Sequence, residues 1–160
     1  METVAGTPAK TATFTIGHSR HDLERFVQLL RDNRIEVVAD VRSRPYSRFA
    51  PQFNKRACAD ALSAVGIRYL YLGQELGGRP EEPAFYDEAG QLQYDRVAAS
   101  PGFNAAVERL EAEARRSRVA LMCGEEDPAR CHRWLLVGRR LVDDGFACRH
   151  IRGDGRVEEG

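Results

Sequence analysis

IEVVADV, residues 35–41, is an almost continuous run of apolar residues that ends at a polar loop. A strand that is apolar on both faces must be covered on both faces, which is typical of parallel sheets in α/β proteins. Residues 23–30, before this run, carry apolar side chains at helical spacing. Residues 55–65, after it, form a second helical segment between Asn54, a candidate N-cap, and Gly66, a candidate stop. The pattern predicts a buried strand between two helices.

The same alternation extends over most of the chain. Strands separated by helices predict a parallel sheet with right-handed crossovers. We therefore expect a single α/β domain over residues 13–152, a three-layer Rossmann-like fold with a mostly parallel sheet flanked by helices, between flexible tails at residues 1–12 and 153–160. Further strands are expected at residues 13–17, 67–72, 119–123 and 146–151, and helices at 19–33 (capped by Ser19 and ended by Asn33), 103–116 and 128–142.

The composition does not call for a strongly charged partner. The 160 residues are enough for one domain with a substantial core, and 24 Lys and Arg balance 24 Asp and Glu, so any basic surface must be local. No run is long and apolar enough for a signal peptide or a membrane span. We therefore expect a cytoplasmic protein with no membrane partner, whose four cysteines are free or metal-bound rather than joined as disulfides.

Polar motifs follow three of the predicted strands. They are GHS at residues 17–19, DVRSRPYSR at residues 40–48 and CGEEDPARCHR at residues 123–133. In parallel α/β sheets, ligands bind beyond the carboxyl ends of the strands, at the point where the strand order reverses. If the first strand lies between the second and the fourth, His18, Arg42 and Cys123 meet in one crevice.

Taken in order, these motifs resemble those of a bacterial and archaeal family. TIGHS, DVRSRPYSR, YLGQELGGRP, MCGEEDPARCHRWLL and a terminal CRHI are together similar to the family catalogued as domain of unknown function 488, over about residues 13–151. The acidic pair Glu125 and Glu126 leaves two candidates for the family's carboxylate, and the resemblance implies no reaction. The matching positions are Gly17, His18, Ser19, Asp40, Arg42, Pro45, Ser47, Leu76, Gly77, Gly78, Cys123, Glu125, Cys131, His132 and Arg133.

The motif at residues 40–48 and its neighbours have the chemistry of an anion site. Guanidinium groups bind phosphate or carboxylate oxygens as planar forks, and we expect Asp40 to orient Arg42 or His18. Glycines in the Gly- and Pro-rich stretch 72–102 suggest a turn close to the ligand. The substrate-binding residues predicted are Ser19, Arg42, Ser43, Ser47, Arg48, Gly77, Gly78, His132 and Arg133, the last two at the start of helix 128–142.

The catalytic residues predicted are His18, Glu125, Cys123 and Asp40. His18 and Glu125 are assigned to proton transfer, because a histidine titrates near neutral pH. Cys123 is either a nucleophile or a buried support of the pocket, and Cys131 is expected to pack; whether the two form a redox pair stays open. A zinc site of both cysteines with His18 and His132 is the other alternative. Adjacent helical residues point about 100° apart, so no metal is predicted.

The expected function is that of an enzyme, a hydrolase or transferase that acts on a phosphate-containing substrate, either a small molecule such as a nucleotide or a nucleic-acid end. The chain has no P-loop, no GxGxxG after the first strand and no HExxH, which argues against P-loop NTPases, typical dinucleotide oxidoreductases and metalloproteases. The sequence leaves any cofactor unknown. Two alternatives stay open: a non-catalytic nucleotide or nucleic-acid binding module, and a zinc-dependent hydrolase.

Overall fold

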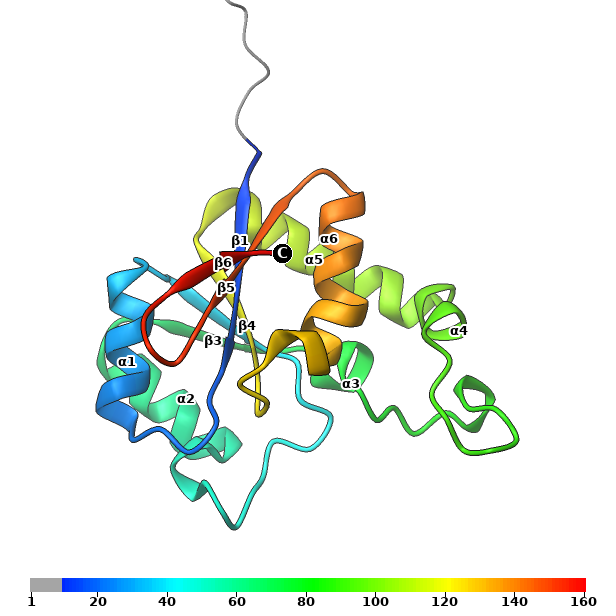
Figure 1. The fold of residues 1–160 in the computed structure, drawn as a ribbon, viewed down its shortest axis with the longest axis horizontal. Helices are drawn as coiled ribbons and strands as arrows, with labels where there is room; N and C mark the ends of the chain where they lie inside the picture. Colours follow the sequence, from blue (N-terminus) through cyan, green and yellow to red (C-terminus); the bar gives the residue numbers. More distant parts are fainter. Residues whose placement is uncertain (1–9) are drawn as a thin grey trace, which may run out of the picture.

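A six-stranded sheet forms the centre of the fold (Figure 1). The computed structural model describes residues 10–160, and its strands lie in the order β3-β2-β4-β1-β5-β6. All neighbouring strands are parallel except β6, which runs antiparallel to β5. The strands are β1 (Ala12–Gly17), β2 (Val37–Asp40), β3 (Arg68–Tyr71), β4 (Val119–Cys123), β5 (Ala147–Ile151) and β6 (Val157–Glu159).

Helices cover both faces of this sheet, which confirms the predicted three-layer, Rossmann-like α/β architecture (Figure 1). The side chains of β2 alternate between two hydrophobic cores: Val37 and Ala39 belong to one and Val38 to the other. This alternation explains why residues 35–41 are apolar without interruption. On the Val38 face lie α1 (Leu23–Asp32) and α2 (Lys55–Ala64), and on the opposite face lie α5 (Pro101–Arg116) and α6 (Arg139–Asp143).

The strand order differs from the one assumed from the sequence. β4, not β1, is the central one of the three strands, because β4 pairs with both β1 and β2. The chain leaves β1 and β2 toward α1 and α2, whereas it leaves β4 toward the opposite face. The loops at the carboxyl end of β4 therefore diverge from those of its two neighbours, which opens a crevice at that edge of the sheet.

One of the predicted helix caps, Ser19, is wrong, and a second, Asn54, is confirmed in position but makes no side-chain bond to its helix. Asp22 is the N-cap of α1, and its carboxylate accepts a hydrogen bond from the Arg25 amide. Ser19 instead adopts a left-handed conformation, with φ of 47°, in the turn after β1. Asn54 does stand before α2, but its side chain accepts from the Ser47 amide across the loop and not from the helix. Asn33 ends α1 as predicted.

The segment predicted as one helix over 128–142 is broken into three parts. A 3₁₀ turn, Pro128–Arg130, is followed by Cys131 in an extended conformation. The chain then enters a wide helical segment, Arg133–Gly138, which continues as α6. Because the helix starts again after Cys131, the side chains that face inward differ from those of one continuous helix, and Arg133 is among the buried ones.

The remaining segments frame the pocket edge and close the sheet. Residues 73–100 extend away from the sheet and contain α3 (Gly73–Leu76), a 3₁₀ turn (Pro83–Phe85) and α4 (Tyr94–Ala98) (Figure 1). At the C-terminal end the expected flexible tail at 153–160 is wrong in part, because Val157–Glu159 pairs with β5. The tail expected at 1–12 lies largely outside the described residues, and β1 begins at Ala12. Within residues 10–160, no helix has the length and apolar character needed to cross a bilayer.

Candidate functional site

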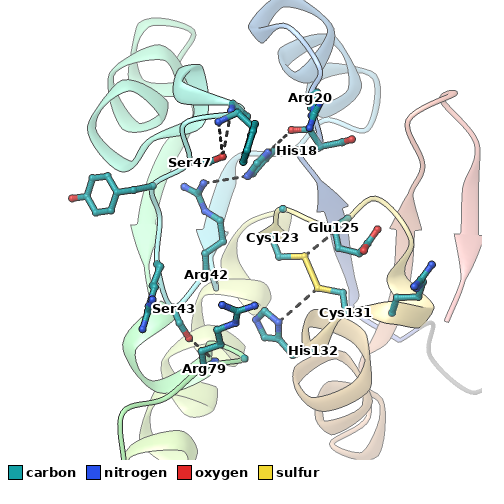
Figure 2. Close-up of a pocket in the computed structure, with 18 of the residues that line it drawn as sticks. His18, Arg20, Arg42, Ser43, Ser47, Arg79, Cys123, Glu125, Cys131 and His132 are labelled. Carbon is teal, nitrogen blue, oxygen red and sulfur yellow. Dashed lines mark hydrogen bonds between the residues drawn. A yellow bond between two sulfur atoms is a disulfide. The ribbon is translucent and has the colours of Figure 1, made fainter. Parts of the chain in front are cut away.

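A pocket of about 780 Å³ opens at the carboxyl ends of β1, β2 and β4 (Figure 2). Its walls come from five places in the chain: the turn after β1, the loop after β2, the turn after α3, the start of α4 and the segment after β4. Nine of the thirteen predicted site residues line it, namely His18, Ser19, Arg42, Ser43, Ser47, Gly78, Cys123, Glu125 and His132. The convergence of His18, Arg42 and Cys123 expected from the sequence is thus observed, although the strand order behind it was assumed wrongly.

The other four predicted site residues do not line the pocket. Asp40 is fully buried behind Arg42, and Arg133 is fully buried behind Cys123. Gly77 is buried against Ser43, where an added Cβ would overlap the serine hydroxyl. Arg48 is exposed in the loop after β2 and lies outside the pocket. Arg48 and Arg133 are therefore not the ligand-binding forks that the sequence suggested.

Arg42 is held in place from behind by Asp40. The guanidinium donates to both carboxylate oxygens, from Nε at 2.9 Å and from Nη2 at 2.8 Å, and the Arg42 amide donates to Oδ1 at 3.0 Å. The Tyr69 hydroxyl donates to the same carboxylate at 2.5 Å. The predicted role of Asp40 in orienting Arg42 is consistent with this geometry. An ion pair fixed in this way takes up Nε and Nη2 and leaves Nη1 to face the pocket, where it contacts His18.

His18 stands beside Arg42 with its ring fixed by contacts on three sides. Its Nδ1 donates to the Ser19 carbonyl at 2.8 Å, so the ring is the tautomer whose Nε2 carries a lone pair. Arg42 Nη1 donates to that Nε2 at 3.2 Å, and Phe53 stacks on the ring at 4.6 Å. Burial lowers the pKa of His18 to about 4, and the positive charge of Arg42 acts in the same direction. The imidazole is neutral at pH 7 and has no proton to give at Nε2.

His132 forms the opposite wall of the pocket. Its Nε2 donates to the Val41 carbonyl at 2.6 Å, which leaves a lone pair on Nδ1. Burial lowers the pKa of His132, so this ring is also neutral. Gly78 packs directly on the imidazole, because an added Cβ would lie 2.9 Å from Nδ1. A side chain at position 78 would therefore press against the His132 ring.

The two adjacent glutamates have different environments. Glu125 is exposed and lines the pocket. Glu126 points away from it and accepts from Arg152 Nε and Nη2 at 3.0 and 2.8 Å and from the Gly153 amide at 2.9 Å. These contacts lower the pKa of Glu126 to about 2, with the Arg152 hydrogen bond as the main cause. Glu125 is thus the carboxylate available to a ligand, and Glu126 fixes the loop.

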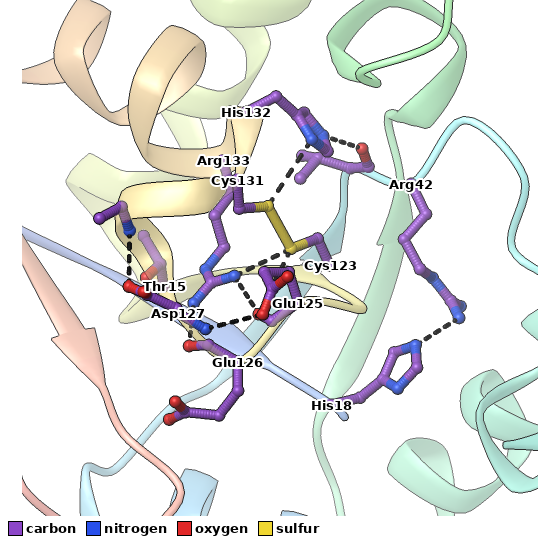
Figure 3. The surroundings of a disulfide bond; sticks show 12 residues. Thr15, His18, Arg42, Cys123, Glu125, Glu126, Asp127, Cys131, His132 and Arg133 are labelled. Carbon is purple, nitrogen blue, oxygen red and sulfur yellow. Dashed lines mark hydrogen bonds between the residues drawn. A yellow bond between two sulfur atoms is a disulfide. The ribbon is translucent and has the colours of Figure 1, made fainter. Parts of the chain in front are cut away.

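Cys123 and Cys131 are joined as a disulfide at the floor of the pocket (Figure 3). The expectation that the cysteines are free or metal-bound is wrong for this pair, while Cys58 and Cys148 are free and buried. The extended residue Cys131 turns its side chain back toward the end of β4, where a continuous helix would have directed it elsewhere. Among residues 10–160, no group of three or more His, Cys, Asp or Glu side chains is arranged to hold a metal ion. The zinc alternative is therefore not supported.

Sequence reasoning missed several residues of the pocket wall. Arg20 follows the GHS motif, Arg79 follows the double glycine, and Arg130 precedes Cys131. Arg20 lies next to a recognised motif, and Arg79 and Arg130 lie within recognised motifs, which is the signal that could have found them. With Arg42 and Arg44, five arginines line the pocket, whereas Glu125 is the one carboxylate that does so. Tyr46 and Phe49, also in the wall, are 68% and 71% exposed.

The fold and the pocket define the class of protein: a Rossmann-like α/β domain with a pocket at the carboxyl ends of its strands, where the strand order reverses. The chain belongs to the family described as domain of unknown function DUF488, whose model matches residues 22–139. This range is narrower than the resemblance seen in the motifs and begins after His18 and Ser19. Searches of curated proteins and of solved structures gave no significant match.

Proposed function

We propose that the chain is a cytoplasmic bacterial enzyme that acts on a phosphate-containing substrate, a nucleotide or a nucleic-acid end, bound in this pocket. One observation carries the proposal. A chain with no net charge places five arginines and one carboxylate around a single crevice. Like charges gathered in this way repel one another, and an anionic ligand offsets that repulsion. Phosphate, with oxygens on several sides, matches several guanidinium groups at once.

Arg42 is the principal anion-binding group in this proposal. Because Asp40 already fixes its orientation, little side-chain entropy is lost when a ligand binds. The Nη1 group that contacts His18 turns its hydrogen bond to a phosphate oxygen. This exchange frees the His18 Nε2 lone pair, which then accepts a hydrogen bond from the substrate or from water. His18 acts as an acceptor and positioning group, not as an acid.

Glu125 is the residue proposed to transfer protons. It is the carboxylate in the pocket wall, and its backbone is fixed by the guanidinium of Arg133 behind it. The exposed rings of Tyr46 and Phe49 stand at the pocket rim, where a nucleobase can stack on them. A phosphate in the arginine cluster and a base on an exposed ring favour a nucleotide or a nucleic-acid end over a simple sugar phosphate.

Calorimetric titration with a nucleoside monophosphate tests the binding step. We expect saturable binding by the wild type, a loss of about tenfold or more for Arg42→Gln, and unchanged binding for Arg109→Gln, which is exposed on α5 and does not line the pocket. Turnover is measured as release of phosphate or of nucleoside from a nucleotide panel. Glu125→Gln should retain binding and lose turnover. Equal binding by wild type and Arg42→Gln would overturn the assignment of the pocket.

The alternative is a non-catalytic module that binds the same ligand, and one observation favours it. Both ring nitrogens of His18 are engaged, and its pKa of about 4 makes it a weak base. The two proposals predict the same effect of Arg42→Gln on binding. They differ in turnover. An enzyme turns over the substrate and loses that activity in Glu125→Gln, whereas a binding module shows no turnover even in the wild type.

A further inference from the structure

Arg133 is a fully buried cation with no carboxylate partner. Its Nη1 donates to the backbone carbonyl of Glu125 and its Nη2 to that of Glu126 at 3.0 Å. No ion pair within residues 10–160 includes Arg133, whose side chain has no solvent exposure. A buried charge without a counter-ion is costly, so the site calls for an anion. Burial lowers the pKa of Arg133 to about 10, as expected for such a cation.

The group that can supply this anion is the Cys123 sulfur. Arg133 Nη1 donates to Cys123 Sγ at 2.9 Å (Figure 3). When the disulfide is reduced, a thiolate at Cys123 would complete an ion pair with Arg133, in an environment where water does not screen the attraction. The thiolate is the reactive form of cysteine, and Cys123 also lines the pocket.

The second sulfur has a different neighbour. His132 Nδ1 lies 3.7 Å from Cys131 Sγ, and it carries a lone pair because Nε2 donates to Val41. A neutral imidazole in this position can accept the proton of the Cys131 thiol. Each sulfur thus has its own activating group: Arg133 for Cys123 and His132 for Cys131.

We propose that Cys123 and Cys131 are a reversible dithiol–disulfide pair that exchanges with low-molecular-weight disulfides, with Cys123 as the attacking thiol and Cys131 as the resolving thiol. In a cytoplasmic protein, as proposed above, a disulfide of this kind is typically transient and either catalytic or redox-sensing. The exchange itself needs no phosphate ligand, so its test is independent of the function proposed for the pocket.

The exchange proceeds in two balanced steps. The Cys123 thiolate attacks one sulfur of a disulfide RSSR; a Cys123–SR bond forms, the S–S bond of RSSR breaks, and RS⁻ leaves and takes a proton from solvent. The Cys131 thiol then transfers its proton to His132 Nδ1 and attacks Cys123 Sγ. The Cys123–Cys131 bond forms, the Cys123–SR bond breaks, and the second RS⁻ leaves with the proton from His132. The protein loses two electrons, and RSSR is reduced to two RSH.

Mass spectrometry of the full chain tests this exchange. The protein is reduced, freed of reductant, treated with oxidised glutathione at pH 7 and then alkylated. The wild type should lose two alkylatable thiols, retain no glutathione and yield linked peptides containing Cys123 and Cys131. Cys131→Ala should retain one glutathione on Cys123. Cys58→Ala, which removes a buried free thiol, should behave as the wild type.

Two further variants test the activating groups. Arg133→Met should slow the first step about tenfold or more, whereas Arg139→Met, an exposed position on the same helical segment, should not. His132→Gln should accumulate the glutathione adduct by slowing only the second step. If Arg133→Met does not fold, trapping in Cys131→Ala still decides the question. Four alkylatable thiols in folded wild type after treatment, or an adduct on Cys58 or Cys148 in Cys131→Ala, would overturn the proposal.

Discussion

Arg42 Nη1 and His18 Nε2 lie 3.2 Å apart, although their strands are not neighbours in the sheet. β4 separates β2 from β1, so the two side chains meet over the carboxyl end of β4, where Cys123 ends the strand (Figure 2). This contact couples the two walls of the pocket. A ligand that binds Arg42 must also change the environment of His18.

The first prediction concerns the carboxylate behind Arg42. Asp40→Asn leaves a buried guanidinium without its counter-ion, so we expect the free energy of unfolding to fall by about 3 kcal/mol or more. Urea denaturation followed by circular dichroism measures this change. The control is Asp154→Asn, an exposed ion-paired position where little change is expected. Equal effects of the two substitutions would contradict the role given to Asp40.

The second prediction concerns the pH dependence of stability. The pKa of His18 is about 4 in the folded protein and near 6.5 when unfolded, so between these values the unfolded chain binds more protons. The stability contributed by neutral His18 is therefore fully present above pH 6.5 and is lost as the pH falls toward 4, by on the order of 3 kcal/mol. Burial also lowers the pKa of His150 to about 4, so His150 contributes to the pH dependence over the same pH range.

Two measurements check this behaviour. The ring resonances of His18, followed by NMR, should titrate with a midpoint near pH 4 in the folded protein. His18→Gln should flatten the decline of unfolding free energy between pH 6.5 and 4 without abolishing it, because the share of His150 remains. A midpoint near 6.5 would show that the imidazole is not buried as described.

The third prediction concerns Gly17, the last residue of β1. A Cβ at this position would overlap the backbone carbonyl of Glu125, so the two loops can approach only if residue 17 is glycine. Gly17→Ala should lower the unfolding free energy by about 2–3 kcal/mol and displace the loop that carries Glu125. Gly102→Ala is the matched control, because its nearest neighbour would be the Glu75 side chain at 3.8 Å. Its stability should be unchanged or slightly higher.

The fourth prediction concerns the anchor of that same loop. Because the pKa of Glu126 is lowered to about 2, the stability from its ion pair with Arg152 is present above about pH 4.5 and is lost as the pH falls toward 2. Glu126→Gln should lower the unfolding free energy by at most about 1 kcal/mol at pH 7, since the side chain is 32% exposed and screened by solvent. The difference from wild type should vanish near pH 2. Glu88→Gln, at an exposed site, should show no such pH dependence.

The sequence was sufficient to predict the layers of this fold because they depend on local patterns. Residues 119–123, predicted as a strand, are β4 without any shift. The apolar run at 35–41 required cover on both faces, and the two cores provide it. The strand order was not predictable in this way. It depends on which face of the sheet each connecting segment packs against, and the apolar pattern of the strands does not show this.

The site was predictable as a set of motifs but not in its internal roles. Strand-end polarity identified His18, Arg42 and Cys123 as neighbours, since parallel strands end at one edge. The roles of Cys131 and Arg133 depended on the break in the predicted helix, and nothing in its apolar spacing indicates that Cys131 is extended. That break joins the two sulfurs and buries the guanidinium that was expected to face a ligand.

The most direct test of the account is an NMR titration of labelled protein with a nucleoside monophosphate, observed at the Nε–H of Arg42. This proton is held by Asp40 and reports on the guanidinium without removing it. We predict saturable shifts at Arg42 together with the amides of His18, Ser43 and Gly124, which surround the pocket. Saturable shifts confined to residues elsewhere in the chain, with the Arg42 signal unchanged, would contradict the claim that this crevice binds the anion.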